Sequence, residues 1–198
     1  MRTRAFRIIR HVFAAITLSM LSACTSLPST DSPLEYLDKD TAATINVVGR
    51  PIVFARDQSE RAAHVRDYVT VAAATVDRGG KTDYVVIAYF WSTLDAHDEP
   101  HTAQALAATD IVFAADDRRI TLHLEGHSAR DIGIGVPVHA PPARSVIPNV
   151  YQTDLATLRY LAAAHHLAVV TADSDMSYEL WDDRRAALGS LVRSLSGE

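Results

Sequence analysis

The order of hydrophobic and polar positions divides the chain into a strand-rich first part and a helix-rich end. Short runs of β-branched and aromatic residues recur between residues 44 and 124, separated by glycine-containing or charged stretches. After residue 150 the apolar residues recur at helical spacing. Strands joined as hairpins, followed by helices, predict an α+β fold: a mainly antiparallel β-sheet with two C-terminal helices packed on it.

The clearest predicted element is a hairpin. Residues 68–76 and 84–91 are rich in Val, Tyr, Ile and Thr, and the stretch between them contains Gly79 and Gly80. Glycine adopts positive φ without a steric penalty, so this stretch suits a tight turn. The run 84–91 is apolar on both faces, and we therefore expect a central strand that is covered on both sides.

Shorter strands are expected before and after this hairpin. They lie on either side of a break at Pro51, in a second hairpin, and near the C-terminus: 44–48, 52–55, 111–114, 120–124, 167–171 and 177–181. Between 120 and 124 the pattern alternates, so Ile120, Leu122 and Leu124 are expected to point inward.

Three stretches suit helices. Asp57-Gln58-Ser59-Glu60 has the composition of a capping box and predicts one helical turn. A longer helix is expected from a cap at Thr153 or Asp154 to about His165. A last helix is expected to follow a cap at Asp182 or Asp183, with an apolar stripe that docks on the sheet: Ala187, Leu188, Leu191, Val192 and Leu195.

Residues 126–150 interrupt this pattern. The segment holds four of the eight prolines and three of the eight glycines of the chain. We interpret it as a long loop, and loops of this length are often functional. It is the preferred place for a binding surface, although a crossover that packs over the sheet explains the same composition.

The first 24 residues have the layout of an export signal. Four arginines (Arg2, Arg4, Arg7 and Arg10) precede an apolar run from Val12 to Leu21 and a small-residue approach to a cleavage point. The apolar run is ten residues long, whereas a bilayer-spanning helix needs roughly twenty. We therefore expect a cleaved leader rather than a permanent span.

The leader ends in Leu21-Ser22-Ala23-Cys24, which resembles the lipobox of bacterial lipoproteins. The resemblance implies that Cys24 carries a lipid and becomes the first residue of the mature protein, anchored in the lipid bilayer. Cys24 is also the one cysteine of the chain. Thr25, rather than Asp, follows it, which by the same resemblance implies an outer-membrane, periplasm-facing position. In general layout the chain is similar to small proteobacterial envelope lipoproteins.

These features divide the chain into three parts: a signal peptide at 1–23, a lipidated tether at 24–35 and a single α+β domain at 36–198. The whole chain has 198 residues and a formal charge of −5. The leader holds four of the 19 basic residues and none of the 24 acidic ones, so the remainder has a charge of −9. This acidity argues against nucleic acid as a partner.

Signatures of catalysis are scarce. Gly126-His127-Ser128-Ala129-Arg130 approaches the nucleophile-elbow pattern but lacks the second glycine. One alternative function is nevertheless an envelope hydrolase that works from the 126–150 segment. It would use His127 or His139 with Ser128, Ser145 or an acidic residue in a deep pocket.

A second alternative is metal binding by histidines near carboxylates. The candidates are His97-Asp98-Glu99-Pro100-His101, His123 with Glu125 and His127, and the pair His165-His166. Pro100 disfavours a helical His97/His101 pair, and strand alternation places His123 on a solvent face. Asp173-Ser174-Asp175 lacks the glycine and the distal Glu of an EF-hand calcium loop, so we expect a turn.

Tyr89-Phe90-Trp91 is the most aromatic stretch. Side chains on a strand alternate between faces, so a flat sugar-stacking platform would use at most Tyr89 and Trp91, and core packing is the favoured interpretation. The leading expectation is thus a membrane-anchored binding or scaffold module without catalysis or cofactor. Its partners are the bilayer, through Cys24, and an unidentified envelope protein or ligand.

Overall fold

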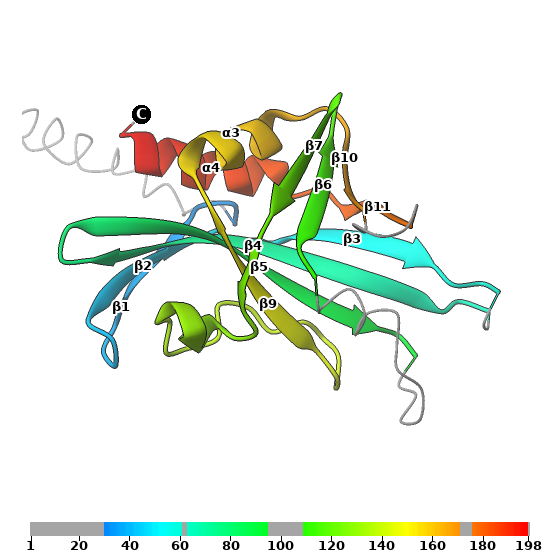
Figure 1. Ribbon diagram of the computed structural model, residues 1–198, viewed down its shortest axis with the longest axis horizontal. Coiled ribbons are helices and arrows are strands. Elements are labelled where there is room, and N and C mark those ends of the chain that lie inside the picture. Colours follow the sequence, from blue (N-terminus) through cyan, green and yellow to red (C-terminus); the bar gives the residue numbers. More distant parts are fainter. Residues whose placement is uncertain (1–29, 61–62, 95–108, 171–175, 198) are drawn as a thin grey trace, which may run out of the picture.

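The computed structural model describes residues 30–60, 63–94, 109–170 and 176–197. Within these residues eleven strands form one antiparallel sheet (Figure 1). In chain order they are β1 (Leu34–Asp38), β2 (Ala43–Val47), β3 (Ile52–Asp57), β4 (Arg66–Arg78), β5 (Lys81–Ser92), β6 (Ile111–Ala115), β7 (Arg118–Leu122), β8 (Leu124–Gly126), β9 (Ile147–Thr153), β10 (Leu167–Val170) and β11 (Ser177–Asp182). The helices are α3 (Leu155–Ala163) and α4 (Arg185–Ser196), with a 3-10 turn, η1 (Ala129–Ile132). The predicted α+β class is confirmed.

The sheet curves until it nearly closes into a barrel. Its strand order is β7-β6-β10-β11-β3-β4-β5-β9-β8. The two end strands, β7 and β8, are separated in the chain by His123 alone. The Asp110 carboxylate accepts a hydrogen bond from the Leu124 amide at 3.0 Å and contacts the His123 ring at 2.7 Å. One bent stretch of chain therefore pairs with β6 at one side and with β9 at the other.

The β4–β5 hairpin is the centre of the sheet, as the sequence predicts. Its register runs from Asp67↔Ser92 to Arg78↔Lys81. The turn consists of Gly79 and Gly80, with φ of 58° and 82°, which match the twist of a tight hairpin. Residues 85–90 of β5 are all buried, so the expected coverage of both faces is confirmed.

Two short strands share one edge of β4. β3 pairs with its first half and β2 with its second, and the predicted break at Pro51 lies between them. A Cβ on Gly49 would lie 2.2 Å from the Ser32 carbonyl oxygen. Glycine at this position thus lets the N-terminal end of the described chain pass close to the break.

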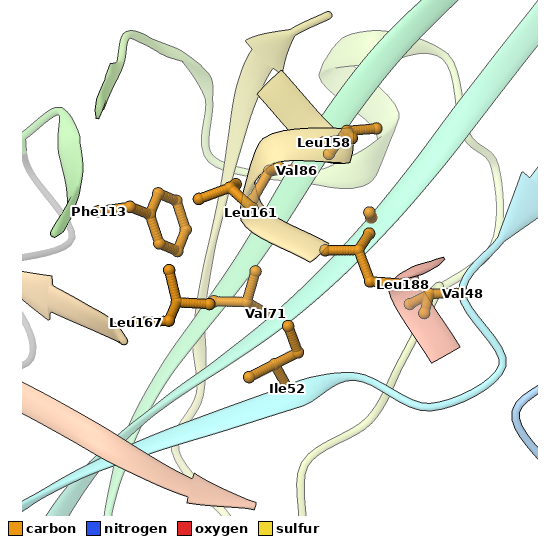
Figure 2. A pocket seen from close by; sticks show the side chains of 10 residues that line it. Val48, Ile52, Val71, Val86, Phe113, Leu158, Leu161, Leu167 and Leu188 are labelled. Carbon is orange, nitrogen blue, oxygen red and sulfur yellow. The ribbon is translucent and has the colours of Figure 1, made fainter. Parts of the chain in front are cut away.

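The two faces of the sheet are covered differently. In Figure 1, α3 and α4 lie on one face, which we call the helix face, and η1 lies on the other, which we call the outer face. Figure 2 shows the helix face, where side chains of both helices meet those of the strands around an apolar cavity of about 20 Å³. The residues at this cavity are Val48, Ile52, Val71, Ala73, Val86, Phe113, Leu158, Leu161, Leu167 and Leu188.

Both C-terminal helices dock as their apolar stripes predict. Asp154 caps α3 by accepting the Thr157 amide at 2.7 Å. Leu158 and Leu161 of α3 are buried, and so are the first four members of the α4 stripe: Ala187, Leu188, Leu191 and Val192. The expected cap of α4 is displaced by one residue, because Arg184 occupies the cap position.

Two predicted elements differ from the structure. The segment after Asp57 forms turns on both sides of residues 61–62, which lie outside the described part, rather than a capped helical turn. The Gln58 amide instead closes a turn with the Val65 carbonyl, and its side chain donates to buried Asp67 at 2.7 Å. The predicted loop at 126–150 is also shorter than expected, because η1 and the start of β9 lie inside it.

Candidate functional site

The segment that follows β8 is fastened to the outer face. The Asp131 carboxylate accepts the backbone amides of His127 at 2.8 Å and Ser128 at 2.9 Å, and these bonds hold its pKa below the usual value. At the other end of η1, the Arg78 guanidinium donates to the Ile132 and Gly133 carbonyls at 3.0 and 2.7 Å. The segment is therefore pinned at both ends of η1.

A third contact fixes the residues after η1. The buried Asp38 carboxylate of β1 accepts the Gly135 amide at 2.5 Å, which lowers the pKa of Asp38. Ile134, the preceding residue, is fully buried. A Cβ on Gly135 would approach both Asp38 oxygens to about 3.0 Å. A carboxylate from the first strand thus holds a backbone 97 residues away.

An apolar cavity of about 230 Å³ lies between this segment and β5. Ile87 and Tyr89 form its floor, and Ser128 and Arg130 supply polar groups at its wall. The other lining residues are Ala129, Ile134, Gly135, Val136, Pro137 and Pro148. Beyond Arg130 lies a wider hollow of about 460 Å³, lined by charges of both signs, among them Arg78, Lys81 and Asp83.

Two histidines of the segment make defined contacts. His127 Nδ1 lies 2.9 Å from Asn149 Oδ1, and Asn149 in turn donates to the Tyr151 hydroxyl at 3.0 Å. Burial raises the pKa of Tyr151 to about 12. His139 donates its backbone amide to the Tyr89 hydroxyl at 3.1 Å, and the two rings meet edge to face. Burial lowers the pKa of the His139 imidazole.

These contacts do not assemble the arrangement that the hydrolase alternative requires. The His127 ring bonds to an amide, and the Ser128 hydroxyl bonds to Asp131. Within the described residues, no hydrogen bond joins the ring of His127 or His139 to a serine hydroxyl. The structure therefore places these residues around one segment without forming a nucleophile–base pair there.

The metal alternative has no cluster within the described ranges, where no group of three His, Cys, Asp or Glu side chains converges. His97 and His101, and the turn at 173–175, lie outside these ranges. His123 faces solvent, as predicted, and pairs with Asp110. The candidate histidines that the structure describes are therefore dispersed.

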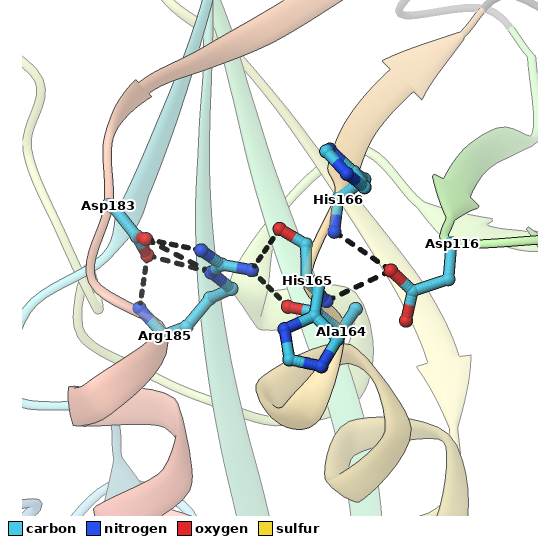
Figure 3. Close-up of polar contacts among 6 residues, drawn as sticks. All are labelled: Asp116, Ala164, His165, His166, Asp183 and Arg185. Carbon is cyan, nitrogen blue, oxygen red and sulfur yellow. Dashed lines mark hydrogen bonds and ion pairs between the residues drawn. The ribbon is translucent and has the colours of Figure 1, made fainter.

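His165 and His166 belong to a structural clamp (Figure 3). Asp116 accepts both of their backbone amides at 2.9 and 2.8 Å. Arg185 donates to the carbonyls of Ala164 and His165 and is itself held by Asp183. In Figure 3 the contacts to Asp116 come from backbone nitrogens rather than from the imidazole rings. The clamp fixes the end of α3 against the β6–β7 turn and the start of α4.

A second feature of the outer face is a group of aromatic side chains beyond the cavity. Tyr68 and Trp91 are cross-strand partners and stack at 4.2 Å between centroids, nearly parallel. Trp181 of β11 meets Tyr68 edge to face at 6.2 Å, and the Arg66 guanidinium lies 4.6 Å from the Trp181 ring centroid. We call these four residues the aromatic platform.

The platform could be predicted from the sequence in part. Core packing is confirmed for Phe90 and Tyr89, which are 2% and 6% exposed. Trp91 is partly exposed, and its ring partners, Tyr68 and Trp181, come from other strands. The alternation of hydrophobic and polar residues could assign each of these three side chains to one face of its own strand. The strand register that brings them together depends on pairings between residues distant in sequence.

Cys24, which the sequence predicts to carry a lipid, and the predicted leader before it lie outside the described residues. Neither α3 nor α4, the α-helices of the described part, has the length and apolar content to cross a bilayer. Comparison with known proteins gives no match to a family model, a curated protein or a solved structure. We therefore infer the function from the residues of this chain.

Proposed function

We propose that this chain is a lipid-anchored protein of the bacterial cell envelope that binds a ligand on the outer face of its sheet domain, without catalysis. The anchor is argued from the leader and from its end, Leu21-Ser22-Ala23-Cys24, which resembles a lipobox. Acylation of one cysteine by several chains would hold such a domain at a membrane. The orientation proposed is periplasm-facing, at the outer membrane.

The observation that carries the binding role is the apolar cavity beside β5. Ligand sites are mostly apolar hollows with a few polar groups that fix orientation. A volume of about 230 Å³ is a little below the roughly 300 Å³ at which drug-sized sites begin. With Ile87 and Tyr89 at the floor and Arg130 at the wall, the cavity suits a small molecule with an apolar body and one polar or anionic end.

Binding is favoured over hydrolysis because the polar groups beside the cavity are already engaged in holding the segment. The Ser128 hydroxyl is bonded to Asp131, and the His127 ring is bonded to Asn149. A nucleophile needs a base within hydrogen-bond reach, and these contacts direct both groups elsewhere. The cavity is apolar, and hydrogen bonds to Asp38, Arg78 and Asp131 hold the segment that lines it, which supports selective binding.

The anchor is tested by replacing Cys24 with Ala. The wild-type chain is expected to incorporate a radioactive fatty acid and to sediment with membranes, and Cys24→Ala is expected to lose both properties. Ser26→Ala, two residues beyond, is the matched control and should behave as the wild type. Unchanged labelling of Cys24→Ala would refute the lipid attachment.

The binding role is tested on the full chain in lipid nanodiscs by methyl NMR. Octanoate, added below its micelle concentration, should shift the Ile87 and Ile134 methyl resonances in a saturable manner. Ile52 is buried on the helix face of the sheet and is not among the residues that line this cavity, so its methyl resonances serve as the internal control. Equal shifts at Ile52, or no saturation, would contradict a site in the cavity.

A further inference from the structure

The aromatic platform is unusual because it keeps a large aromatic surface in solvent. Trp181 is 57% exposed, although large apolar side chains elsewhere on the sheet are mostly buried. The indole is nevertheless held in place, by Tyr68 at its side and Arg66 over its ring. An exposed but rigid ring loses little conformational entropy when a ligand covers it.

Strand alternation places Trp181 on the outer face, because its neighbour Leu180 faces the core. The pairing of β11 with β3 runs Leu180↔Phe54 and then Asp182↔Val53, so Trp181 is the extra residue of a β-bulge. The extra residue of a bulge is left unpaired in the ladder. Leu180 continues the partly buried packing against the core, whereas Trp181 turns to solvent.

The neighbouring strands complete a shallow surface. Glu179, Ala55, Tyr68 and Trp91 are successive cross-strand partners on β11, β3, β4 and β5. Because Ala55 has a small side chain, the surface is depressed between Glu179 on one side and the aromatic rings of Tyr68 and Trp91 on the other. The Trp91 indole is fixed by a 3.0 Å hydrogen bond from its Nε1 to Thr70 Oγ1.

The charges at the rim restrict the class of ligand. Arg66 pairs with Asp57 at 3.5 Å, Arg184 pairs with Asp182 beside Trp181 at 2.9 Å, and Glu179 is exposed in the same register. Two cations against three carboxylates are unfavourable for phosphate groups. Arg66 lies over the Trp181 ring, and its positive charge would repel a cationic ligand from that ring. A neutral ligand with an apolar face and a hydrogen-bonding edge remains.

We propose that the aromatic platform binds a neutral pyranose ring of a glycan. The sugar stacks its C–H face on the part of the Trp181 indole that Arg66 leaves exposed, and its hydroxyl groups reach the Asp57–Arg66 pair, which offers acceptors and donors side by side. This inference adds a ligand class to the proposed binding module. It concerns residues separate from those that line the apolar cavity. A negative result in the test of one site therefore leaves the other site standing.

The two tryptophans of the chain, Trp91 and Trp181, both belong to the platform. Intrinsic tryptophan fluorescence therefore reports on this site alone. The full chain, in a zwitterionic detergent without a sugar headgroup, is titrated with chitotetraose and cellotetraose as neutral glycans. A decaproline peptide, the alternative occupant of an aromatic surface, is titrated separately. A saturable fluorescence change with at least one of the glycans is expected.

Variants locate the binding. Trp181→Ala is expected to weaken glycan affinity about tenfold, equivalent to about 1.4 kcal/mol, and Trp181→Phe is expected to retain part of it. Because Trp181→Ala removes one fluorophore, affinities of all variants are compared by calorimetry. Leu37→Ala, at another exposed apolar residue (62% exposed), is the matched control and should bind as the wild type.

Arg66→Gln provides a second variant if Trp181→Ala does not fold. It retains a planar hydrogen-bonding group and is expected to weaken binding less than Trp181→Ala. Three outcomes overturn the proposal: no saturable change with either glycan, equal affinity in wild type and Trp181→Ala, or binding of decaproline alone.

Discussion

At the scale of single residues, carboxylates that accept backbone amides hold this structure together. Asp131 fastens η1, Asp116 fastens the end of α3, and Asp38 fastens the residues after η1. In each case the hydrogen bonds favour the charged carboxylate and lower its pKa. The same chemical device thus fixes three irregular stretches that hydrophobic periodicity alone does not specify.

These carboxylates predict loss of stability in acid. A carboxylate whose pKa is lower in the folded than in the unfolded state stabilises the fold at pH values above its unfolded-state pKa of about 3.9. This stabilisation is lost as the pH falls through the folded-state pKa. The His139 imidazole, whose pKa burial also lowers, contributes in the same direction from about pH 6.5 downward. The urea concentration at the unfolding midpoint should therefore decrease as the pH is lowered from 7 to 3.

The control for this prediction is the double variant Asp116→Asn/Asp131→Asn. It should be less stable than the wild type at pH 7, and its stability should depend less on pH between 5 and 3. An identical pH dependence in both proteins would show that these two side chains do not account for the acid sensitivity.

At the scale of elements, the β4–β5 turn has the strictest requirement. Gly80 has φ of 82° and no atom within 4 Å of a Cβ built on it, so a substitution there meets backbone strain and no clash. Gly80→Val should destabilise by about 1–2 kcal/mol. Gly79→Asn should be nearly neutral, because Asn accepts positive φ in such turns. Urea unfolding of the two variants measures the difference, and equal stabilities would contradict the turn assignment.

Periodicity and turn chemistry were sufficient for the elements whose signals are local. The hairpin around Gly79 and the stripes of α3 and α4 are examples. β9 was missed because it contains Pro148 and Asn149, which are rare in strands. At Pro148, β9 pairs with β5 on one side but not with β8 on the other. This is an edge position, where the missing N–H of proline is tolerated.

The candidate site was predictable only in outline. The segment 126–150 was expected to contribute a binding surface, and the cavity does lie beneath it. The contacts that shape it, from Asp38 and Arg78, come from residues far away in the chain. No local pattern specifies such partners, and the bulge at Trp181 shifts a register that alternation assumes to be regular.

At the scale of the whole molecule, closure of the sheet depends on the bend between β7 and β8. Asp110 holds that bend through the Leu124 amide and the His123 ring. β7 pairs with β6 at one end of the strand order, and β8 pairs with β9 at the other end. The loss of this carboxylate should therefore affect a region much larger than the bend.

Asp110→Ala should increase amide hydrogen exchange in β8 and β9 while leaving β4 and β5 protected. His123→Phe keeps the Asp110–Leu124 hydrogen bond and removes only the ring nitrogen that contacts Asp110, on a side chain that is 80% exposed, so it should change exchange little. Hydrogen-exchange mass spectrometry distinguishes the two variants. Uniform exchange changes across the sheet would contradict an effect of Asp110 that is confined to the closing strands.

The tight turn at Gly79 and Gly80 also bears on the order in which the sheet forms. Its strands meet across two residues, so their pairing has a small loop-closure entropy, whereas Leu180 must find Phe54 across most of the chain. Contacts distant in sequence slow folding. We expect the β4–β5 hairpin to be structured in the folding transition state, and the strands that close the barrel to join it afterwards.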